Sequence, residues 1–110
     1  MRKSAFGIVF VTCPSRLEAE KLARGMLENR LAACVNIIKA VDSFFWWKGK
    51  IDHAQEFLLI IKTKEKLFKV LERYVKTRHS YQVPEVILIP IAVGHRPYLD
   101  WMVESLKTKR

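Results

Sequence analysis

The sequence is poor in the residues that build redox and metal-cluster proteins, because its 110 residues include only two cysteines, Cys13 and Cys34. They form no C-x-x-C pair, which excludes a thioredoxin-type redox motif and a closed zinc site. The sequence also lacks G-x-S-x-G, a glycine-rich phosphate loop and H-E-x-x-H. No apolar run approaches the roughly 18 residues that a membrane-spanning helix needs. We therefore expect a protein that is neither an enzyme nor embedded in a membrane.

The first residues are basic and then apolar, as in a secretory signal peptide. However, no small-x-small cleavage site closes the run before Thr12-Cys13-Pro14. We interpret the segment as the first buried strand of a cytoplasmic protein, a compartment that disfavours a disulfide. Glycine and proline number only four each, and no linker or repeat divides residues 1–110, which predicts one domain.

Basic residues outnumber acidic ones by 20 to 11, which gives a net charge of +9. Such an excess is compatible with nucleic acid or other anionic partners. The charges are dispersed, however, and acidic and basic residues in 62–78 follow the spacing of a solvated helix face. Sheets that bind RNA stack bases on aromatic residues of an RNP1 pattern, and this pattern is absent. Of the three functions that we consider for this protein, nucleic-acid binding is therefore the least favoured.

Three amphipathic helices are predicted from apolar residues that recur at helical spacing. The first follows a capping box, in which the Ser15 hydroxyl accepts a hydrogen bond from a helical N–H and Glu18 reaches back. The expected helices are residues 16–30, residues 64–78 with Thr63 as N-cap, and residues 96–107 with Pro97 in the first turn.

Strands are predicted where apolar, β-branched and aromatic residues cluster. The two middle strands are long and are joined by a turn at Gly49, and the first of them bends between Lys39 and Asp42. Pro90 marks an edge or a bulge, because proline cannot donate to a strand ladder. The expected strands are residues 5–12, 31–47, 51–62 and 85–91.

The predicted order is β-α-β-β-α-β followed by a helix, which is the α+β ferredoxin-like fold. Two helices cover one face of its antiparallel sheet, so the other face and the long central hairpin stay uncovered. The aromatic run from Phe44 to Trp47 would lie on that hairpin. An exposed apolar surface of this kind indicates an oligomer. Alternatively, the last helix folds back over the open face of its own subunit.

Several short motifs are spread along nearly the whole chain. They are Thr12-Cys13-Pro14, Leu31 to Asn36, Ser43 to Lys50, Glu56 with Ile61-Lys62-Thr63, His79 to Glu85, Pro90, and Tyr98 to Trp101. In this order and spacing they resemble the CutA family, the divalent-cation-tolerance proteins. The resemblance implies a ferredoxin-like homotrimer whose long strands form intersubunit sheets, without catalytic activity. Trimers of this shape also resemble the PII signalling proteins, which bind small ligands in clefts between subunits.

The resemblance also implies a copper site in one branch of the family. Its described ligands are a cysteine near the end of the first strand and two adjacent histidines before the Pro-Tyr loop. The corresponding positions here hold Val11, Arg78 and His79, so one ligand of three matches. A cation beside Arg78 would meet a fixed positive charge. We therefore expect copper binding that is weaker than in that branch or that uses other ligands.

His79 is the best single metal candidate, because it lies in a predicted loop and imidazole binds Cu(II) and Zn(II). The alternative is a histidine that is hydrogen-bonded to the loop backbone. Cys13 is a second metal candidate, because the N-terminus of the following helix lowers the pKa of a thiol; the alternative is a packed thiol. Cys34 is expected only to pack, and His53 and His95 to be exposed.

Five further residues belong to the family pattern and are chemically mixed. In a cleft between subunits, Lys62 would supply charge, Tyr81 a hydroxyl and Trp101 an apolar wall for a polar or anionic ligand. Alternatively, the acidic members pair with lysine or arginine and the aromatic ones fill the trimer interface. The five cleft candidates are Glu56, Lys62, Tyr81, Glu85 and Trp101.

We predict a cytoplasmic, non-enzymatic homotrimer that takes part in divalent-cation tolerance. It would bind Cu(II) or another divalent cation and no organic cofactor. The alternative is a PII-like trimeric module that binds a small ligand and has no physiological metal. Metal binding should depend on His79, whereas a cleft ligand should depend on Lys62 and Tyr81.

Overall fold

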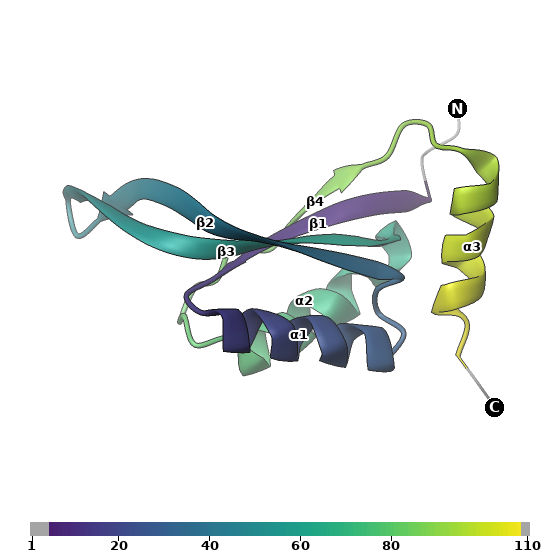
Figure 1. Ribbon diagram of the computed structural model, residues 1–110, viewed down its shortest axis with the longest axis horizontal. Helices are drawn as coiled ribbons and strands as arrows, with labels where there is room; N and C mark the ends of the chain where they lie inside the picture. Colours follow the sequence, from purple (N-terminus) through teal and green to yellow (C-terminus); the bar gives the residue numbers. More distant parts are fainter. Residues whose placement is uncertain (1–4, 109–110) are drawn as a thin grey trace.

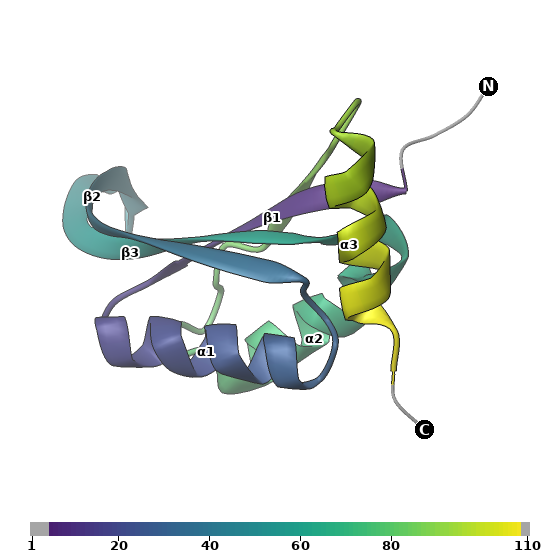
Figure 2. The same ribbon diagram turned by 45° about the vertical axis from the view of Figure 1, so that its right-hand side comes forward.

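The computed structural model describes residues 5–108, and its elements follow the predicted order. Four antiparallel strands form one sheet in the order β2-β3-β1-β4, so β2 and β4 are its edges. Helices α1 and α2 cover one face, and α3 stands across the end of the sheet (Figures 1 and 2). Within the described residues, no helix is long and apolar enough to cross a membrane. The elements are β1 Phe6–Cys13, α1 Arg16–Glu28, β2 Cys34–Trp47, β3 Lys50–Lys64, a 3₁₀ turn Glu65–Leu67, α2 Phe68–Arg78, β4 Ile87–Pro90 and α3 Arg96–Leu106.

The main core lies between the sheet and helices α1 and α2. Alternate residues of β1 are buried, because successive side chains of a strand point to opposite faces. The two helices approach closely at Gly25, where a Cβ atom would lie 1.7 Å from the hydroxyl of Tyr74. The fully buried side chains include Val9, Val11 and Cys13 of β1, Leu59 and Ile61 of β3, Met26 of α1, and Leu71 and Val75 of α2.

Only half of the predicted capping box forms at α1. The Glu18 N–H donates to the Ser15 hydroxyl at 3.2 Å, as predicted. The Glu18 carboxylate, which was expected to reach back, instead accepts a hydrogen bond of 2.9 Å from the backbone N–H of Ser80 in the loop after α2. The Ser80 N–H thus takes the place of the backbone N–H at the start of α1 as the donor to the Glu18 carboxylate. This bond directs the Glu18 side chain toward the end of β1.

The second strand and the second helix begin later than predicted. The chain turns at Arg30, whose φ is 58°, so residues 31–33 connect α1 to β2 and are not part of the strand. Thr63 is not an N-cap, because it lies in β3 and its buried hydroxyl donates to the Leu31 carbonyl at 2.7 Å. A buried hydroxyl needs such a partner. Helix α2 therefore starts at Phe68 without a side-chain cap.

The predicted irregularities of β2 and β4 are confirmed. The pairing of β2 with β3 shifts between Ile38 and Val41, and Ala40 between them has a φ of 62°. An inserted residue of this kind bends the strand. Pro90 ends β4 opposite Gly7, on an edge strand where its missing N–H is tolerated.

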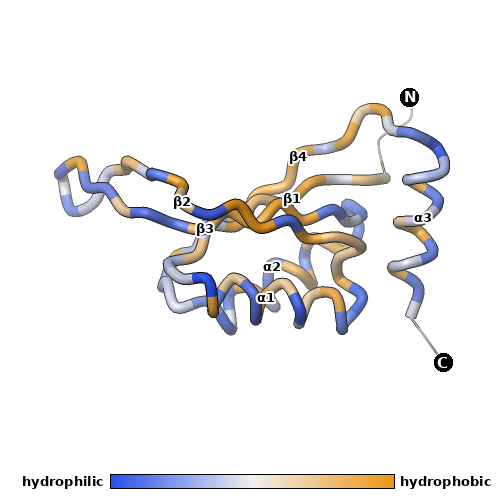
Figure 3. Tube along the Cα trace, in the orientation of Figure 1, coloured by the Kyte–Doolittle hydropathy of each residue, from blue (hydrophilic) through white to orange (hydrophobic). Residues whose placement is uncertain are grey.

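The far half of the β2–β3 hairpin, residues 42–55, projects beyond both helices, and we call it the hairpin arm (Figure 1). Hydrophilic and hydrophobic positions alternate along the arm (Figure 3), and its exposed large apolar residues include Phe44, Trp46 and Ile51. Phe44 and Trp46 are 71% and 74% exposed within the subunit. Helix α3 does not cover the arm, since its buried Leu99 and Met102 pack with Ala33 at the opposite end of the sheet. Within residues 5–108, the last helix therefore leaves the hairpin arm uncovered.

Candidate functional site

Three side chains with metal-binding atoms meet where β1 ends. Cys13 is the last residue of β1, Glu18 lies in the first turn of α1, and His79 follows α2 directly. One ligand atom from each side chain lies within 4.8 Å of the other two. The structure therefore brings the two predicted metal candidates together and adds a carboxylate to them. We call Cys13, Glu18 and His79 the donor cluster.

The imidazole of His79 is buried and held in one orientation. Its Nε2 lies 2.7 Å from the carbonyl oxygen of Thr12, and its Nδ1 accepts the Tyr81 N–H at 3.0 Å. Because a carbonyl oxygen only accepts, these bonds assign the ring proton to Nε2 and a lone pair to Nδ1. The predicted alternative, a histidine that bonds the backbone, is thus present. The same Nδ1 lies 3.2 Å from Oε2 of Glu18, so it also faces the donor cluster.

A second acidic group, formed by Glu56, Glu85 and Tyr81, lies beside the Cys13 thiol. The Tyr81 hydroxyl donates to Oε2 of Glu56 at 2.6 Å, and Glu56 is only 6% exposed. Burial and then this hydrogen bond raise the pKa of Tyr81. Burial and then the Glu56 carboxylate raise the pKa of Glu85.

Lysine and arginine do not neutralise this acidic group. Among residues 5–108, neither Glu56 nor Glu85 forms an ion pair. Within residues 5–108 of one subunit the predicted pairing of Glu56 and Glu85 with basic residues is therefore absent, and pairing between subunits stays a prediction. The end of β1 combines three carboxyl groups with one imidazole, which leaves it rich in negative charge although the whole chain is basic.

The thiol of Cys13 is less acidic than the sequence predicts. Burial raises its pKa to about 12, and the carboxylates of Glu18 and Glu56 contribute further. The helix N-terminus was expected to lower it. The prediction is wrong because loss of solvent and two nearby negative charges outweigh the helix dipole. The two carboxylates that disfavour a thiolate would favour a cation next to it, whereas burial disfavours both charges.

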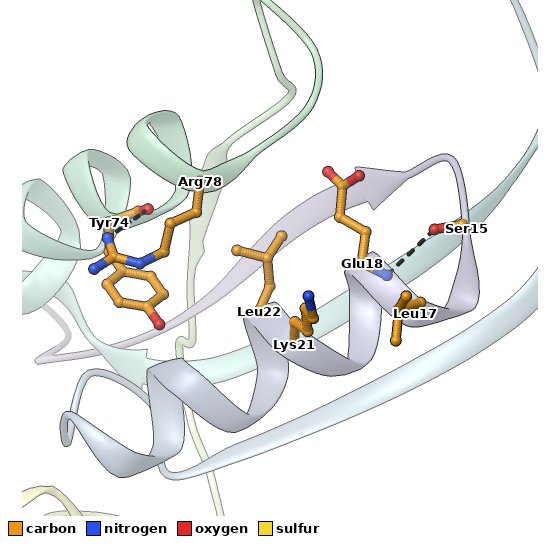
Figure 4. A pocket seen from close by; sticks show the side chains of 7 residues that line it. All are labelled: Ser15, Leu17, Glu18, Lys21, Leu22, Tyr74 and Arg78. Carbon is orange, nitrogen blue, oxygen red and sulfur yellow. Dashed lines mark hydrogen bonds between the residues drawn. The ribbon is translucent and has the colours of Figure 1, made fainter.

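Arg78 is held away from the donor cluster. Its guanidinium lies over the Tyr74 ring, 3.8 Å from the ring centre, and donates to the Thr77 hydroxyl at 3.0 Å. Figure 4 shows Arg78 against Tyr74 and the Glu18 side chain on the neighbouring helix, both lining a groove of about 560 Å³ between α1 and α2. The guanidinium keeps its charge, but its direction toward Tyr74 weakens the expected repulsion between Arg78 and a cation bound at the donor cluster.

Two of the five cleft candidates lie in a different place. The Lys62 ammonium donates to the side-chain oxygen of Asn36 and lies 4.0 Å from the sulfur of Cys34. Trp101 of α3 packs against Tyr98, with ring centres 5.4 Å apart. Within one subunit, the candidates therefore divide into an acidic group at the end of β1 and a lysine–aromatic group near α3.

The remaining cysteine and histidines are placed largely as expected. Cys34 is half-buried, but it contacts Lys62 and is not only packed. Burial and then Cys34 raise the pKa of Tyr98. His53 and His95 are both exposed, and His53 stacks on Phe44 of the hairpin arm.

Sequence reasoning missed Glu18 as a member of the site. Its position three residues after Ser15 assigned it to the capping box, and its actual partners are distant in sequence. These partners are the His79 ring and the Ser80 N–H. A negatively charged residue in the first turn of a helix is common, so no local pattern distinguishes this glutamate from an ordinary one.

Comparison with known proteins gives a consistent result. The family model described as CutA1 divalent ion tolerance protein matches residues 7–105. A protein of Archaeoglobus fulgidus named divalent-cation tolerance protein CutA is 46% identical over 99 residues, covering 90% of this chain and 96% of that protein. A rice protein named CutA 1, chloroplastic, is 44% identical over 91% of this chain. The chain spans only 56% of that rice protein.

Solved structures agree with the sequence comparison. The crystal structure of rice CutA1 superposes with a TM-score of 0.92 at 41% identity, covering 97% of this chain and 98% of that one. The structure described as the periplasmic divalent cation tolerance protein CutA of Archaeoglobus fulgidus gives a TM-score of 0.90 at 44% identity. It covers 93% of this chain and 99% of that one.

Proposed function

Since this chain belongs to the CutA1 divalent ion tolerance family, we propose that it acts in divalent-cation tolerance as a non-enzymatic, cation-binding homotrimer. The observation that carries the proposal is the donor cluster with its surrounding carboxyl groups. A thiol, an imidazole and a carboxylate meet there, and no lysine or arginine of residues 5–108 pairs with them. Buried negative charge without a cationic partner is costly, and a divalent ion would relieve that cost.

The hairpin arm supports the trimer. The element order β-α-β-β-α-β supports a ferredoxin-like fold, and within residues 5–108 no further strand pairs with the outer edges of β2 and β4. Exposed edges and an exposed aromatic cluster are surfaces that another chain would cover. The proposal is that the arms pair between subunits into intersubunit sheets, with three subunits as the family resemblance implies. A trimer would also bring the two groups of cleft candidates from neighbouring subunits within reach of each other.

Equilibrium dialysis of the metal-stripped protein against Cu(II) and Zn(II) tests cation binding. We expect about one ion per chain and an affinity that falls at least tenfold in His79→Ala, because that variant loses a ligand. His95→Ala is the matched control, since His95 is exposed and lies outside the donor cluster. Circular dichroism of each variant reports whether the fold survives. Absence of any uptake by the wild-type protein would overturn the proposed function.

A second candidate function rests on the lysine–aromatic group near α3. The Lys62 ammonium, the Asn36 amide and the Tyr98–Trp101 pair combine a positive charge with an apolar wall, as in a small-ligand site. This arrangement favours a PII-like trimeric module without a physiological metal. The two functions are distinguished by their dependence on residues, because Lys62→Ala should leave cation binding unchanged and abolish binding of an anionic ligand. A cytoplasmic location is part of both proposals.

A further inference from the structure

The geometry points to a specific ligand set: we infer that Cys13 Sγ, a Glu18 carboxylate oxygen and His79 Nδ1 together bind a thiophilic divalent ion such as Zn(II) or Cd(II). This inference rests on the proposed cation-binding function and names the ligands and the class of ion. It also replaces the ligand pattern that the family resemblance implies, because two of those positions here hold Val11 and Arg78.

The three atoms are close enough to share one ion. They lie within 4.8 Å of one another, and Nδ1 is 3.2 Å from Oε2 of Glu18. In a tetrahedral site, bonds of about 2.0–2.3 Å place neighbouring ligand atoms roughly 3.5 Å apart. The ligand atoms would therefore have to approach one another by up to about 1.3 Å to share one ion. The fourth position would hold water or an exogenous ligand.

The tautomer of His79 suits a metal at Nδ1. Its Nε2–H donates to the Thr12 carbonyl, which fixes the ring and leaves the lone pair of Nδ1 facing the cluster. Metal-bound histidines typically donate their other ring N–H to a backbone carbonyl or a carboxylate in this way. An ion at Nδ1 competes only with the Tyr81 N–H, which that atom accepts at 3.0 Å.

The contact between His79 and Glu18 is consistent with the same assignment. With the proton on Nε2, the Nδ1 lone pair accepts the Tyr81 N–H, and Oε2 of Glu18 lies 3.2 Å from the same nitrogen with no proton between the two atoms. Two acceptors at this distance repel unless a cation or a proton lies between them. A proton on Nδ1 would in turn place two N–H groups, those of His79 and Tyr81, against each other. A metal ion between the nitrogen and the carboxylate removes the first conflict, provided that the Tyr81 N–H gives up its hydrogen bond to Nδ1.

The ligand types determine which ions fit. Thiolate and imidazole favour Zn(II), Cd(II) and copper, whereas Mg(II) and Ca(II) require six or more oxygen ligands that this cluster does not offer. Binding would release the Cys13 proton, so the protein should acidify an unbuffered solution as the ion enters. Glu18 supplies the negative charge and the oxygen ligand of the set.

Titration of the metal-stripped protein with Cd(II) alone tests the ligand set by ultraviolet absorption. A thiolate-to-cadmium charge-transfer band should grow to about one equivalent per chain, and it should disappear in Cys13→Ser. Cys34→Ser, the matched control, should keep the band. Glu18→Gln should weaken binding about tenfold or more, and it tests the site separately because Glu18 is only partly buried and not part of the hydrophobic core.

The outcomes separate this inference from the function on which it rests. If the wild-type protein binds Cd(II) or Cu(II) without a thiolate band, or if the band depends on Cys34, the ligand set is wrong and cation binding stands. If Glu18→Gln binds as tightly as wild type, the carboxylate is not a ligand. If no divalent ion binds at all, the proposed function fails together with the inference. Equal affinity for Mg(II) and Zn(II) would contradict the assigned class of ion.

Discussion

The hydrogen bond between Tyr81 and Glu56 gives a quantitative prediction. Tyr81→Phe removes one hydroxyl and leaves the packing of the ring intact. The lost bond is short, at 2.6 Å, and its acceptor is a carboxyl group that is 6% exposed and has no ion-pair partner within residues 5–108. Hydrogen bonds to charged groups contribute about 1.5–3 kcal/mol, and a carboxylate left buried without a donor is costly. We expect the free energy of unfolding to fall by about 2 kcal/mol.

Urea denaturation followed by circular dichroism measures this loss. All variants are compared at one protomer concentration, because the stability of an oligomer depends on it. Tyr98→Phe is the control, since that tyrosine is 40% exposed and its loss should cost less than about 1 kcal/mol. A double-mutant cycle with Glu56→Gln isolates the coupling between the two side chains. A loss below about 0.5 kcal/mol in Tyr81→Phe would refute the reasoning.

Three other predictions follow from exposure and from the shifted pKa values. Because the pKa of Glu85 is raised on folding, the folded protein holds the carboxyl proton of Glu85 more tightly than the unfolded chain does. The free energy of unfolding should therefore fall as the pH rises from 4.5 toward the raised pKa of the folded state. Urea denaturation midpoints measure this fall, which should be smaller in Glu85→Gln. Cys13, with its pKa raised to about 12, should resist iodoacetamide at a pH near 8 in the native protein and react after unfolding, as followed by mass spectrometry. Equal rates of alkylation in the native and the unfolded protein would contradict the buried position of Cys13. Trp46→Lys should shift the protein toward monomers in sedimentation experiments, whereas Leu17→Lys, at an exposed residue of α1, should not.

Most of the fold could be predicted because its causes are local. Helical and strand periodicity is a property of neighbouring residues, and the bend near Ala40 and the edge position of Pro90 follow from the chain itself. The wrong predictions concern residues whose hydrogen-bond partner is distant in sequence. Thr63 was assigned to a helix cap, but its hydroxyl bonds the carbonyl of Leu31, which only the folded chain brings near.

The site was predictable only in part for the same reason. His79 and Cys13 carry recognisable ligand atoms, so the sequence identified both. Glu18 joins them only because the loop after α2 lies against the start of α1, and no local pattern reports that contact. Likewise, the electrostatic surroundings of Cys13 depend on Glu56, which lies on a strand paired with β1.

Native mass spectrometry of the metal-stripped protein, titrated with Cu(II) and Zn(II), tests the central claim most directly. A trimer that takes up one ion per chain, and that loses this uptake in His79→Ala, is the result predicted by a cation-binding function at the end of β1. A trimer that stays free of metal at every concentration would contradict cation binding and favour a small ligand near Lys62. A monomer would contradict the role of the hairpin arm in assembly.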